Sequence, residues 1–232
     1  MTAPITLQTK DGAFNAYVAA PTGKGPWPTI VVIQEIFGIN KVVRDIADHL
    51  ATLGYLAVAP DLFWRIEPGI DITDQSEAEW KRAFELYTAF DVDRGVEDIG
   101  TTLAAIRADE RCNGKVGVVG YCLGGLLAFL TATRTDADCA VSYYGVGIDA
   151  HLAEAEKLAK PVVLHIAEAD EFVPQPARER IAATLKNDAQ VRIFTYPGRN
   201  HAFARVGGQH YDAADAAAAN ARTETFFAEH LS

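Results

Sequence analysis

The sequence of 232 residues predicts an α/β fold, in which a mostly parallel, doubly wound sheet follows an N-terminal antiparallel hairpin. Three observations favour this fold. Short segments rich in β-branched residues recur along the chain, helical segments lie between them, and the strand segments are apolar on both faces. Parallel strands that helices cover on both sides have this last property.

The hairpin is predicted from residues 5–20, which alternate between apolar and polar side chains around an Asp11-Gly12 turn. The later strands are predicted at Thr29–Ile33, Leu56–Ala59, Val116–Val119, Ala140–Tyr144, Val162–Ile166 and Val191–Tyr196. His165 is central in one of these apolar segments, so we interpret it as a core residue.

The first predicted helix begins after Asn40, which is a suitable N-cap, and ends at Gly54. Its apolar residues keep the 3.6-residue spacing of a helix that lies on a sheet. Further helices are predicted at residues 77–87, 91–107, 174–186 and 212–227. No repeat or flexible linker divides the chain, and we therefore expect one domain over residues 1–232.

The charge balance of the chain excludes some partners. It has 21 basic and 31 acidic residues, a net charge of −10, which opposes binding to nucleic acid and to anionic membrane surfaces. No apolar run approaches the length of a membrane span, and the first residues lack the features of a signal peptide. The three cysteines form neither a disulfide framework nor a zinc motif. We expect a cytoplasmic protein without a metal or an organic cofactor.

A candidate nucleophile lies in the segment Gly120-Tyr121-Cys122-Leu123-Gly124, which follows a predicted strand and precedes a predicted helix. The pattern is G-x-S-x-G with sulfur in place of oxygen, in the context that this motif requires. A sharp turn at the cysteine needs neighbours without a Cβ atom. The positive end of the following helix favours a thiolate at Cys122.

Three polar residues lie in the loops just after other predicted strands, at the sheet edge where ligands bind in such folds. They are Glu35, Asp170 and His201. The order cysteine, acid, histidine along the chain is the order of the catalytic residues in the G-x-S-x-G enzymes. Each also has a simpler interpretation: His201 as a solvated loop residue, Asp170 as a cap of the helix after Pro174, and Glu35 as a surface residue.

The chain resembles a known family over nearly its whole length. The motifs that carry the resemblance are QEIFG (34–38), APDLF (59–63), AFDV (89–92), GKVGVVGYCLGG (114–125), YYGVG (143–147), FVP (172–174) and HAFAR (201–205). It is similar to the dienelactone hydrolases (carboxymethylenebutenolidases), which are monomeric, cytosolic α/β-hydrolases that open an unsaturated lactone to maleylacetate. The resemblance therefore implies a carboxylic ester hydrolase with a lactone or ester substrate.

By this resemblance, Cys122, Asp170 and His201 form the catalytic triad. The backbone N–H groups of Ile36 and Leu123 form the oxyanion hole. Glu35 controls the ionisation of the thiol when substrate arrives. Arg205 binds the free carboxylate of the substrate.

The chain departs from the family pattern at Trp80, where the pattern has a second arginine. Either Arg82 takes its place, or the protein accepts a larger or less charged substrate. Phe84 lies one turn further on, where it either lines the pocket or packs in the core. Two alternative functions follow: a broader carboxylesterase or thioesterase of the same fold, or a thiol redox sensor that uses Cys122 for oxidation.

Overall fold

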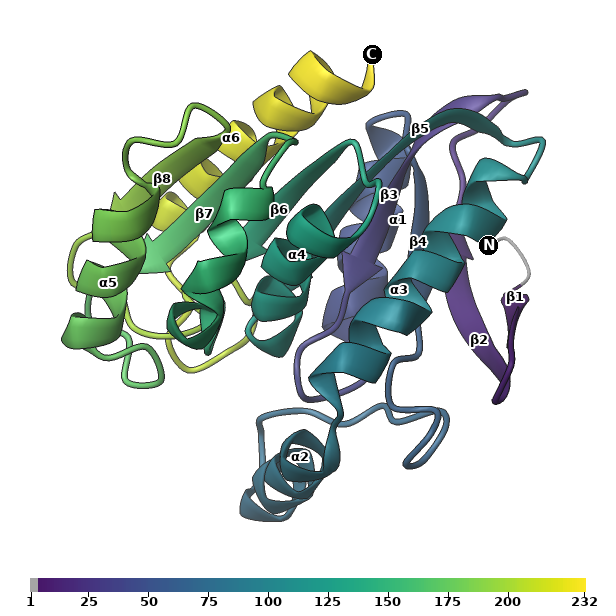
Figure 1. Cartoon of the computed structure of the whole chain (residues 1–232). Coiled ribbons are helices and arrows are strands. Elements are labelled where there is room, and N and C mark those ends of the chain that lie inside the picture. Colours follow the sequence, from purple (N-terminus) through teal and green to yellow (C-terminus); the bar gives the residue numbers. More distant parts are fainter. Residues whose placement is uncertain (1–3) are drawn as a thin grey trace. The chain divides into compact units, whose positions relative to one another are not determined.

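The N-terminal hairpin is confirmed. In the computed structural model, which describes residues 4–232, β1 (Ile5–Thr9) and β2 (Gly12–Ala19) pair antiparallel, and Thr9 lies opposite Gly12 (Figure 1). The structure divides into two compact units, one up to Val118 and one from Val119 to His230. Strand β5 (Cys112–Tyr121) runs from the first unit into the second. The expectation of one domain over the whole chain stays a prediction.

The first unit contains a mixed set of strands in the order β1-β2-β4-β3. Strand β4 (Leu56–Pro60) pairs antiparallel with β2 and parallel with β3 (Trp27–Ile33). Every residue of β4 is buried, as expected for a strand that is covered on both faces.

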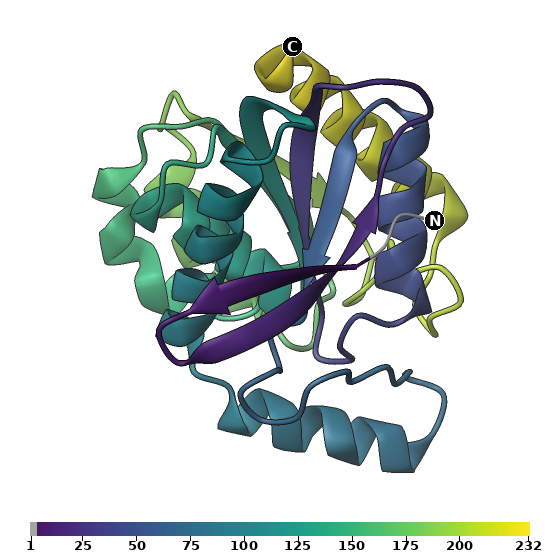
Figure 2. The ribbon, with the colours of Figure 1, turned by 90° about the vertical axis from the view of Figure 1, so that its right-hand side faces the viewer.

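Helices α1 (Lys41–Thr52) and α3 (Val92–Arg107) lie on opposite sides of these strands (Figure 2). Helix α1 begins as predicted, because the Asn40 side chain accepts a hydrogen bond from the N–H of Val43 at 3.2 Å. It ends before Gly54, whose φ of +96° is the left-handed conformation that favours glycine after a helix. Helix α2 (Glu77–Ala89), capped by Ser76, stands apart from the strands of its unit.

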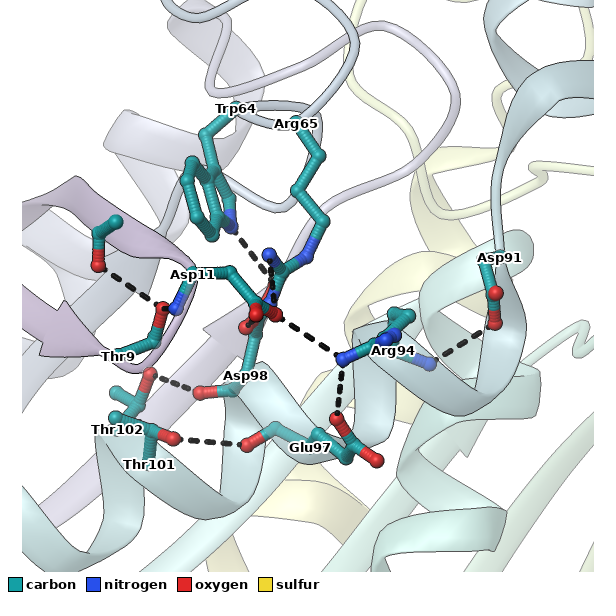
Figure 3. A network of polar contacts seen from close by, with 11 residues as sticks. Thr9, Asp11, Trp64, Arg65, Asp91, Arg94, Glu97, Asp98, Thr101 and Thr102 are labelled. Atoms are coloured by element: carbon teal, nitrogen blue, oxygen red, sulfur yellow. Dashed lines mark hydrogen bonds and ion pairs between the residues drawn. The ribbon is translucent and has the colours of Figure 1, made fainter.

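A polar network joins the hairpin turn to α3 (Figure 3). The buried carboxylate of Asp98 accepts hydrogen bonds from Trp64 Nε1 and Arg65 Nη2, both at 2.8 Å. Asp11, in the hairpin turn, pairs with Arg65 at 3.1 Å and with Arg94 at 3.0 Å. Burial raises the pKa of Asp98, although the bonds from Trp64 and Arg65 oppose this shift.

The second unit contains three parallel strands in the order β6 (Cys139–Tyr143), β7 (Val162–Ala167) and β8 (Val191–Tyr196). Its helices are α4 (Leu123–Arg134), α5 (Gln175–Leu185) and α6 (Ala213–Leu231). Helix α4 packs on β6 and is buried at every position from Leu123 to Thr133. The mixed α/β fold that the sequence predicts is thus confirmed.

One element of the second unit was not predicted. Residues Ile148–Lys157 form a 3₁₀ segment, which begins after Gly147, a residue with φ of +94°. The remaining helices begin and end within a few residues of their predicted positions, as is usual for helix ends. None of the helices within residues 4–232 is both long enough and apolar enough to cross a membrane.

Candidate active site

Cys122 lies at the sharp turn between β5 and α4. Its backbone has φ of 56° and ψ of −115°, a conformation that residues other than glycine rarely adopt. Such strain costs roughly 1–3 kcal/mol and is typical of functional sites. A Cβ atom at Gly120 would lie 1.9 Å from the carbonyl oxygen of Gly124, so only glycine fits at position 120. The predicted tight turn is present.

Main-chain hydrogen bonds hold this turn. The Cys122 carbonyl accepts N–H groups from Gly125 at 3.0 Å, Leu126 at 3.3 Å and Val146 at 3.3 Å. The Cys122 N–H donates to the carbonyl of Tyr143 at 3.1 Å. Leu123 is the first residue of α4, and N–H groups in the first turn of a helix have no acceptor within the helix.

His201 and Asp170 form a buried pair. The Nδ1 atom of His201 lies 2.9 Å from Oδ2 of Asp170, and the two residues are 5% and 3% exposed. The other oxygen of Asp170, Oδ1, accepts the N–H groups of Phe172 at 2.8 Å and Val173 at 3.1 Å. The interpretation of His201 as a solvated loop residue is therefore wrong. Asp170 does not cap α5 either, since the N-cap position is Pro174.

The charge of Cys122 affects the pKa of His201. Burial alone would lower the pKa of His201, but the charge of Cys122 and the hydrogen bond to Asp170 outweigh it and raise the pKa to about 10. Because Nδ1 faces Asp170, Nε2 is the nitrogen left for the sulfur. Nε2 makes no full hydrogen bond with residues 4–232, and catalytic hydrogen bonds often tighten only when substrate binds.

The segment after β8 positions His201 and Arg205. Ala202 has a left-handed φ of 60°, and Phe203 is fully buried against the rings of Tyr144 and Tyr196. The N–H of Arg205 donates to the carbonyl of Ala202 at 2.9 Å, which closes a turn. Arg205 itself is 8% exposed. The turn and the Phe203 anchor explain the HAFAR motif as a way to fix two polar side chains in one loop.

Asn200, which was not among the predicted residues, joins the loops that carry the acid and the histidine. Its Oδ1 accepts the N–H of His201 at 2.7 Å and that of Glu171, next to Asp170, at 3.1 Å. An asparagine beside a candidate histidine is a weak signal, because its partner lies 29 residues away in the sequence.

In the first unit, Glu35 and Ile36 lie in the loop after β3, and both are buried. The interpretation of Glu35 as a surface residue is therefore wrong. Gln34, which was not among the predicted site residues, holds this loop: its side chain accepts the N–H of Leu62 at 3.0 Å and donates to the Glu35 carbonyl at 3.3 Å. Gly38 ends the motif with φ of +76°, and a Cβ atom there would lie 2.0 Å from the Ile70 carbonyl oxygen.

Helix α2 carries the remaining candidates. The centroid of the Trp80 ring lies 5.1 Å from that of buried Phe37, in an edge-on contact, and 5.6 Å from that of Phe84, on which it stacks. The Nε1 atom of Trp80 donates to the Asp74 carbonyl at 3.0 Å. Arg82 pairs instead with two carboxylates, those of Glu67 and Glu85. Trp80 and Phe84 are thus together in one aromatic cluster, and Arg82 is engaged by its acidic neighbours.

The candidates divide between the two units. Cys122, Asp170 and His201 are together in the second unit, where Leu123 and Arg205 also lie. Glu35, Ile36, Trp80 and Phe84 belong to the first unit. In the part of the chain from residue 4 onward, no three histidine, cysteine or acidic side chains gather as metal ligands would.

The fold is that of an α/β hydrolase, a class that carries its nucleophile at the strained turn between a strand and a helix. The model of the dienelactone hydrolase family matches residues 14–231, and the chain belongs to this family. It is accordingly an enzyme of the hydrolase class.

Named relatives agree with this assignment. A protein of Azospirillum brasilense, provisionally named carboxymethylenebutenolidase, is 49% identical over 225 residues, which cover 95% of each chain. The carboxymethylenebutenolidase of Pseudomonas putida is 40% identical over 229 residues, 98% of this chain and 97% of its own. A crystal structure from Klebsiella pneumoniae, provisionally described as a dienelactone hydrolase, has a TM-score of 0.87 at 25% identity and covers 98% of both chains.

Proposed function

We propose that the protein hydrolyses enol lactones such as dienelactone, which gives maleylacetate, through a thioester on Cys122. The observation that supports this most is the buried pair of His201 and Asp170, 2.9 Å apart, beside a cysteine whose charge raises the pKa of the imidazole. Relatives named carboxymethylenebutenolidase, 40–49% identical to this chain, also support it.

In the acylation step, the Cys122 thiolate attacks the lactone carbonyl carbon and forms the C–S bond. The N–H groups of Leu123 and Ile36 are the proposed donors to the oxyanion, and one such donor is typically worth about 3–4 kcal/mol. The ring C–O bond then breaks. The released enolate takes the proton of the His201 imidazolium, which leaves an acyl-enzyme and a neutral imidazole.

In the deacylation step, Nε2 of His201 takes a proton from a water molecule that attacks the thioester. Asp170 fixes the ring through Nδ1 during this transfer. The C–S bond breaks, and the carboxylic acid and the thiolate result. Because a thiolate leaves a tetrahedral intermediate more readily than an alkoxide does, acylation needs a stabilised leaving group such as an enolate, and enol lactones meet this requirement.

Glu35 and Arg205 have proposed supporting roles. Glu35 would control the ionisation of the Cys122 thiol, and Arg205 would bind a carboxylate of the substrate, as in the family that the sequence resembles. Their burial, 5% and 8% exposed, is consistent with groups that act in a site closed to water. A guanidinium is suited to a carboxylate because it donates two parallel hydrogen bonds. We also propose that residues 1–232 act as a cytoplasmic, monomeric domain.

The test uses cis- and trans-dienelactone beside p-nitrophenyl acetate and an acyl thioester. We expect Cys122→Ala to abolish lactone opening while circular dichroism stays native, and Cys112→Ala, a matched control on β5, to keep wild-type activity. Intact-protein mass spectrometry of quenched reactions should detect an acyl adduct on Cys122.

Two outcomes would overturn the proposal. Full lactone opening by Cys122→Ala would exclude the thioester route. Oxidation of Cys122 by peroxide without any acylation by enol lactones would instead favour a redox sensor.

A broader carboxylesterase is the second candidate, and the aromatic cluster at Trp80 favours it. The indole nitrogen is already bound to Asp74, and the rings of Phe37 and Phe84 face the indole, so this part of α2 offers apolar surface to a substrate. Under this alternative, Trp80→Arg should raise kcat/KM for dienelactone and lower it for neutral aryl esters. Arg82→Gln, the matched control, should change neither. An unchanged ratio in Trp80→Arg would reject the role of Trp80 in substrate choice.

A further inference from the structure

A buried chain of hydrogen bonds in the second unit has no part in the proposed chemistry. At its centre is His165 on β7, which is 1% exposed. Its Nδ1 lies 2.8 Å from the Tyr196 hydroxyl and its Nε2 lies 3.0 Å from Oγ1 of Thr223 on α6. In order, the side chains that are joined are Arg222, Tyr196, His165, Thr223, Tyr143 and Asn220.

Arg222, at one end of the hydrogen-bonded chain, sets the direction of the first hydrogen bonds. The Arg222 guanidinium has only donors, so at 3.0 Å it donates to the Tyr196 hydroxyl. The Tyr196 proton is then directed to Nδ1 of His165, which accepts it. Burial, together with the charge of Arg222, lowers the pKa of His165 to about 3, so the ring is neutral and carries its one proton on Nε2.

From His165 to Asn220, the hydrogen bonds of the hydrogen-bonded chain continue in the same direction. Nε2–H of His165 donates to Thr223, whose hydroxyl donates to that of Tyr143 at 2.7 Å. The Tyr143 hydroxyl donates to Oδ1 of Asn220 at 3.0 Å. Each hydroxyl and ring nitrogen in the chain therefore has a defined role, which fixes the side chain of Tyr143 at its hydroxyl end.

The fixed tyrosine is in contact with the strained turn. The Tyr143 ring lies 4.3 Å from the His165 ring and stacks at 4.7 Å on Tyr121, which directly precedes Cys122. The Tyr143 carbonyl accepts the N–H of Cys122 at 3.1 Å. The hydrogen-bonded chain thus includes Tyr143, the residue whose carbonyl holds the main chain of the nucleophile.

A second contact reaches the histidine of the site. The main-chain carbonyl of His165 accepts the N–H of Tyr144 at 2.8 Å, and the Tyr144 ring meets the edge of the His201 ring at 5.0 Å. Tyr144 has a left-handed φ of 38°, so its placement depends on the contacts around it. His165 therefore touches two consecutive residues, one in contact with Cys122 and one in contact with His201.

We propose that His165 and its hydrogen-bonded chain position the reacting groups, by holding Tyr143 against Cys122 and Tyr144 against His201. This inference rests on the proposed function, in that its kinetic test needs an active enzyme. His165 touches no reacting atom and is a positioning residue. A displacement of a reacting group by about 1 Å costs on the order of a hundredfold in rate, so even a small relaxation of Tyr143 is measurable.

The kinetic test replaces Thr223. Thr223→Val keeps the side-chain shape but removes the hydroxyl between His165 and Tyr143, and Thr223→Ser keeps the hydroxyl. We expect Thr223→Val to lower kcat by about tenfold or more, with KM unchanged within about twofold, and Thr223→Ser to retain most of kcat. Phe227→Leu, at a fully buried position of the same helix, is the control for lost stability and should keep kcat.

Two kinetic results would overturn the proposal: wild-type kcat in Thr223→Val, or an equal loss of kcat in Phe227→Leu at matched thermal stability. Nitrogen-15 NMR of the imidazoles gives a readout that needs no substrate. Wild-type His165 should carry its proton on Nε2 and not titrate from about pH 5 to about pH 9. A proton on Nδ1, or titration near pH 6.5, would reject the assigned direction even if the protein hydrolysed no lactone.

Discussion

Asp170 uses its two carboxylate oxygens for different partners: Oδ1 accepts two loop N–H groups, and Oδ2 holds Nδ1 of His201 at 2.9 Å. In Asp170→Asn, the amide oxygen keeps the loop bonds and the NH₂ group faces Nδ1, which selects the wrong tautomer of His201. We expect kcat for enol lactone hydrolysis to fall by roughly 10³–10⁴-fold. Glu179→Gln, an exposed acid on α5, is the control. A loss of less than about tenfold would contradict the role of Asp170.

The pKa of His201 depends on Cys122. In the wild-type protein it is raised to about 10, so the ring holds its proton through neutral pH. In Cys122→Ala, the charge that opposes the effect of burial is absent, and we expect the pKa of His201 to fall. NMR titration of the imidazole measures both values, with Cys112→Ala as the control. An unchanged pKa of His201 in Cys122→Ala would mean that the thiolate does not act on the ring.

Two glycines separate a steric requirement from a conformational one. In Gly120→Ala the new Cβ would lie 1.9 Å from a carbonyl oxygen, and we expect a loss of more than about 4 kcal/mol in the free energy of unfolding, or no folded protein. Gly198 has φ of +69° but nothing within 4 Å of the added atom, so Gly198→Ala should cost only about 1–2 kcal/mol. Urea denaturation ranks the two variants, and equal losses would contradict the steric argument.

The two arginines around Asp11 should differ in their contribution to stability. The side chain of Asp98 is 2% exposed, and Arg65→Met leaves its carboxylate without a cation. We expect a loss of about 3 kcal/mol in the free energy of unfolding. Arg94 is 42% exposed, so Arg94→Met should cost less than about 1 kcal/mol.

The loss of stability in Arg65→Met has a pH dependence with a defined sign. Burial raises the pKa of Asp98, so the folded state binds a proton there at a higher pH than the unfolded state does. Protonation removes the unpaired charge, and the loss in Arg65→Met should therefore shrink as the pH is lowered through the folded pKa. Thermal unfolding over a pH series measures this effect. A loss that grows on acidification would contradict it.

The parts of the fold that depend on local sequence were predicted well. The hairpin and the start of α1 follow from a turn dipeptide, an alternating pattern and a capping side chain, all within a few residues of one another. The 3₁₀ segment at Ile148–Lys157 was not predicted, although its Ala, Leu, Glu and Lys residues favour helical conformations.

The sequence also predicted the candidate site only in part. The turn at Cys122 and the residues after the strands were found because a strand–turn–helix pattern places them. His165 was correctly interpreted as buried, but its partners Tyr196 and Thr223 lie 31 and 58 residues away. Gln34 and Asn200 were missed for the same reason, because each joins segments that are distant in the sequence.

The turn at Cys122 is held through backbone atoms: four main-chain hydrogen bonds and a glycine that admits no side chain. None of these contacts involves the sulfur. The backbone conformation at residue 122 therefore does not depend on the side-chain sulfur. Exchange of the thiol for a hydroxyl would change the nucleophile and leave the turn as it is.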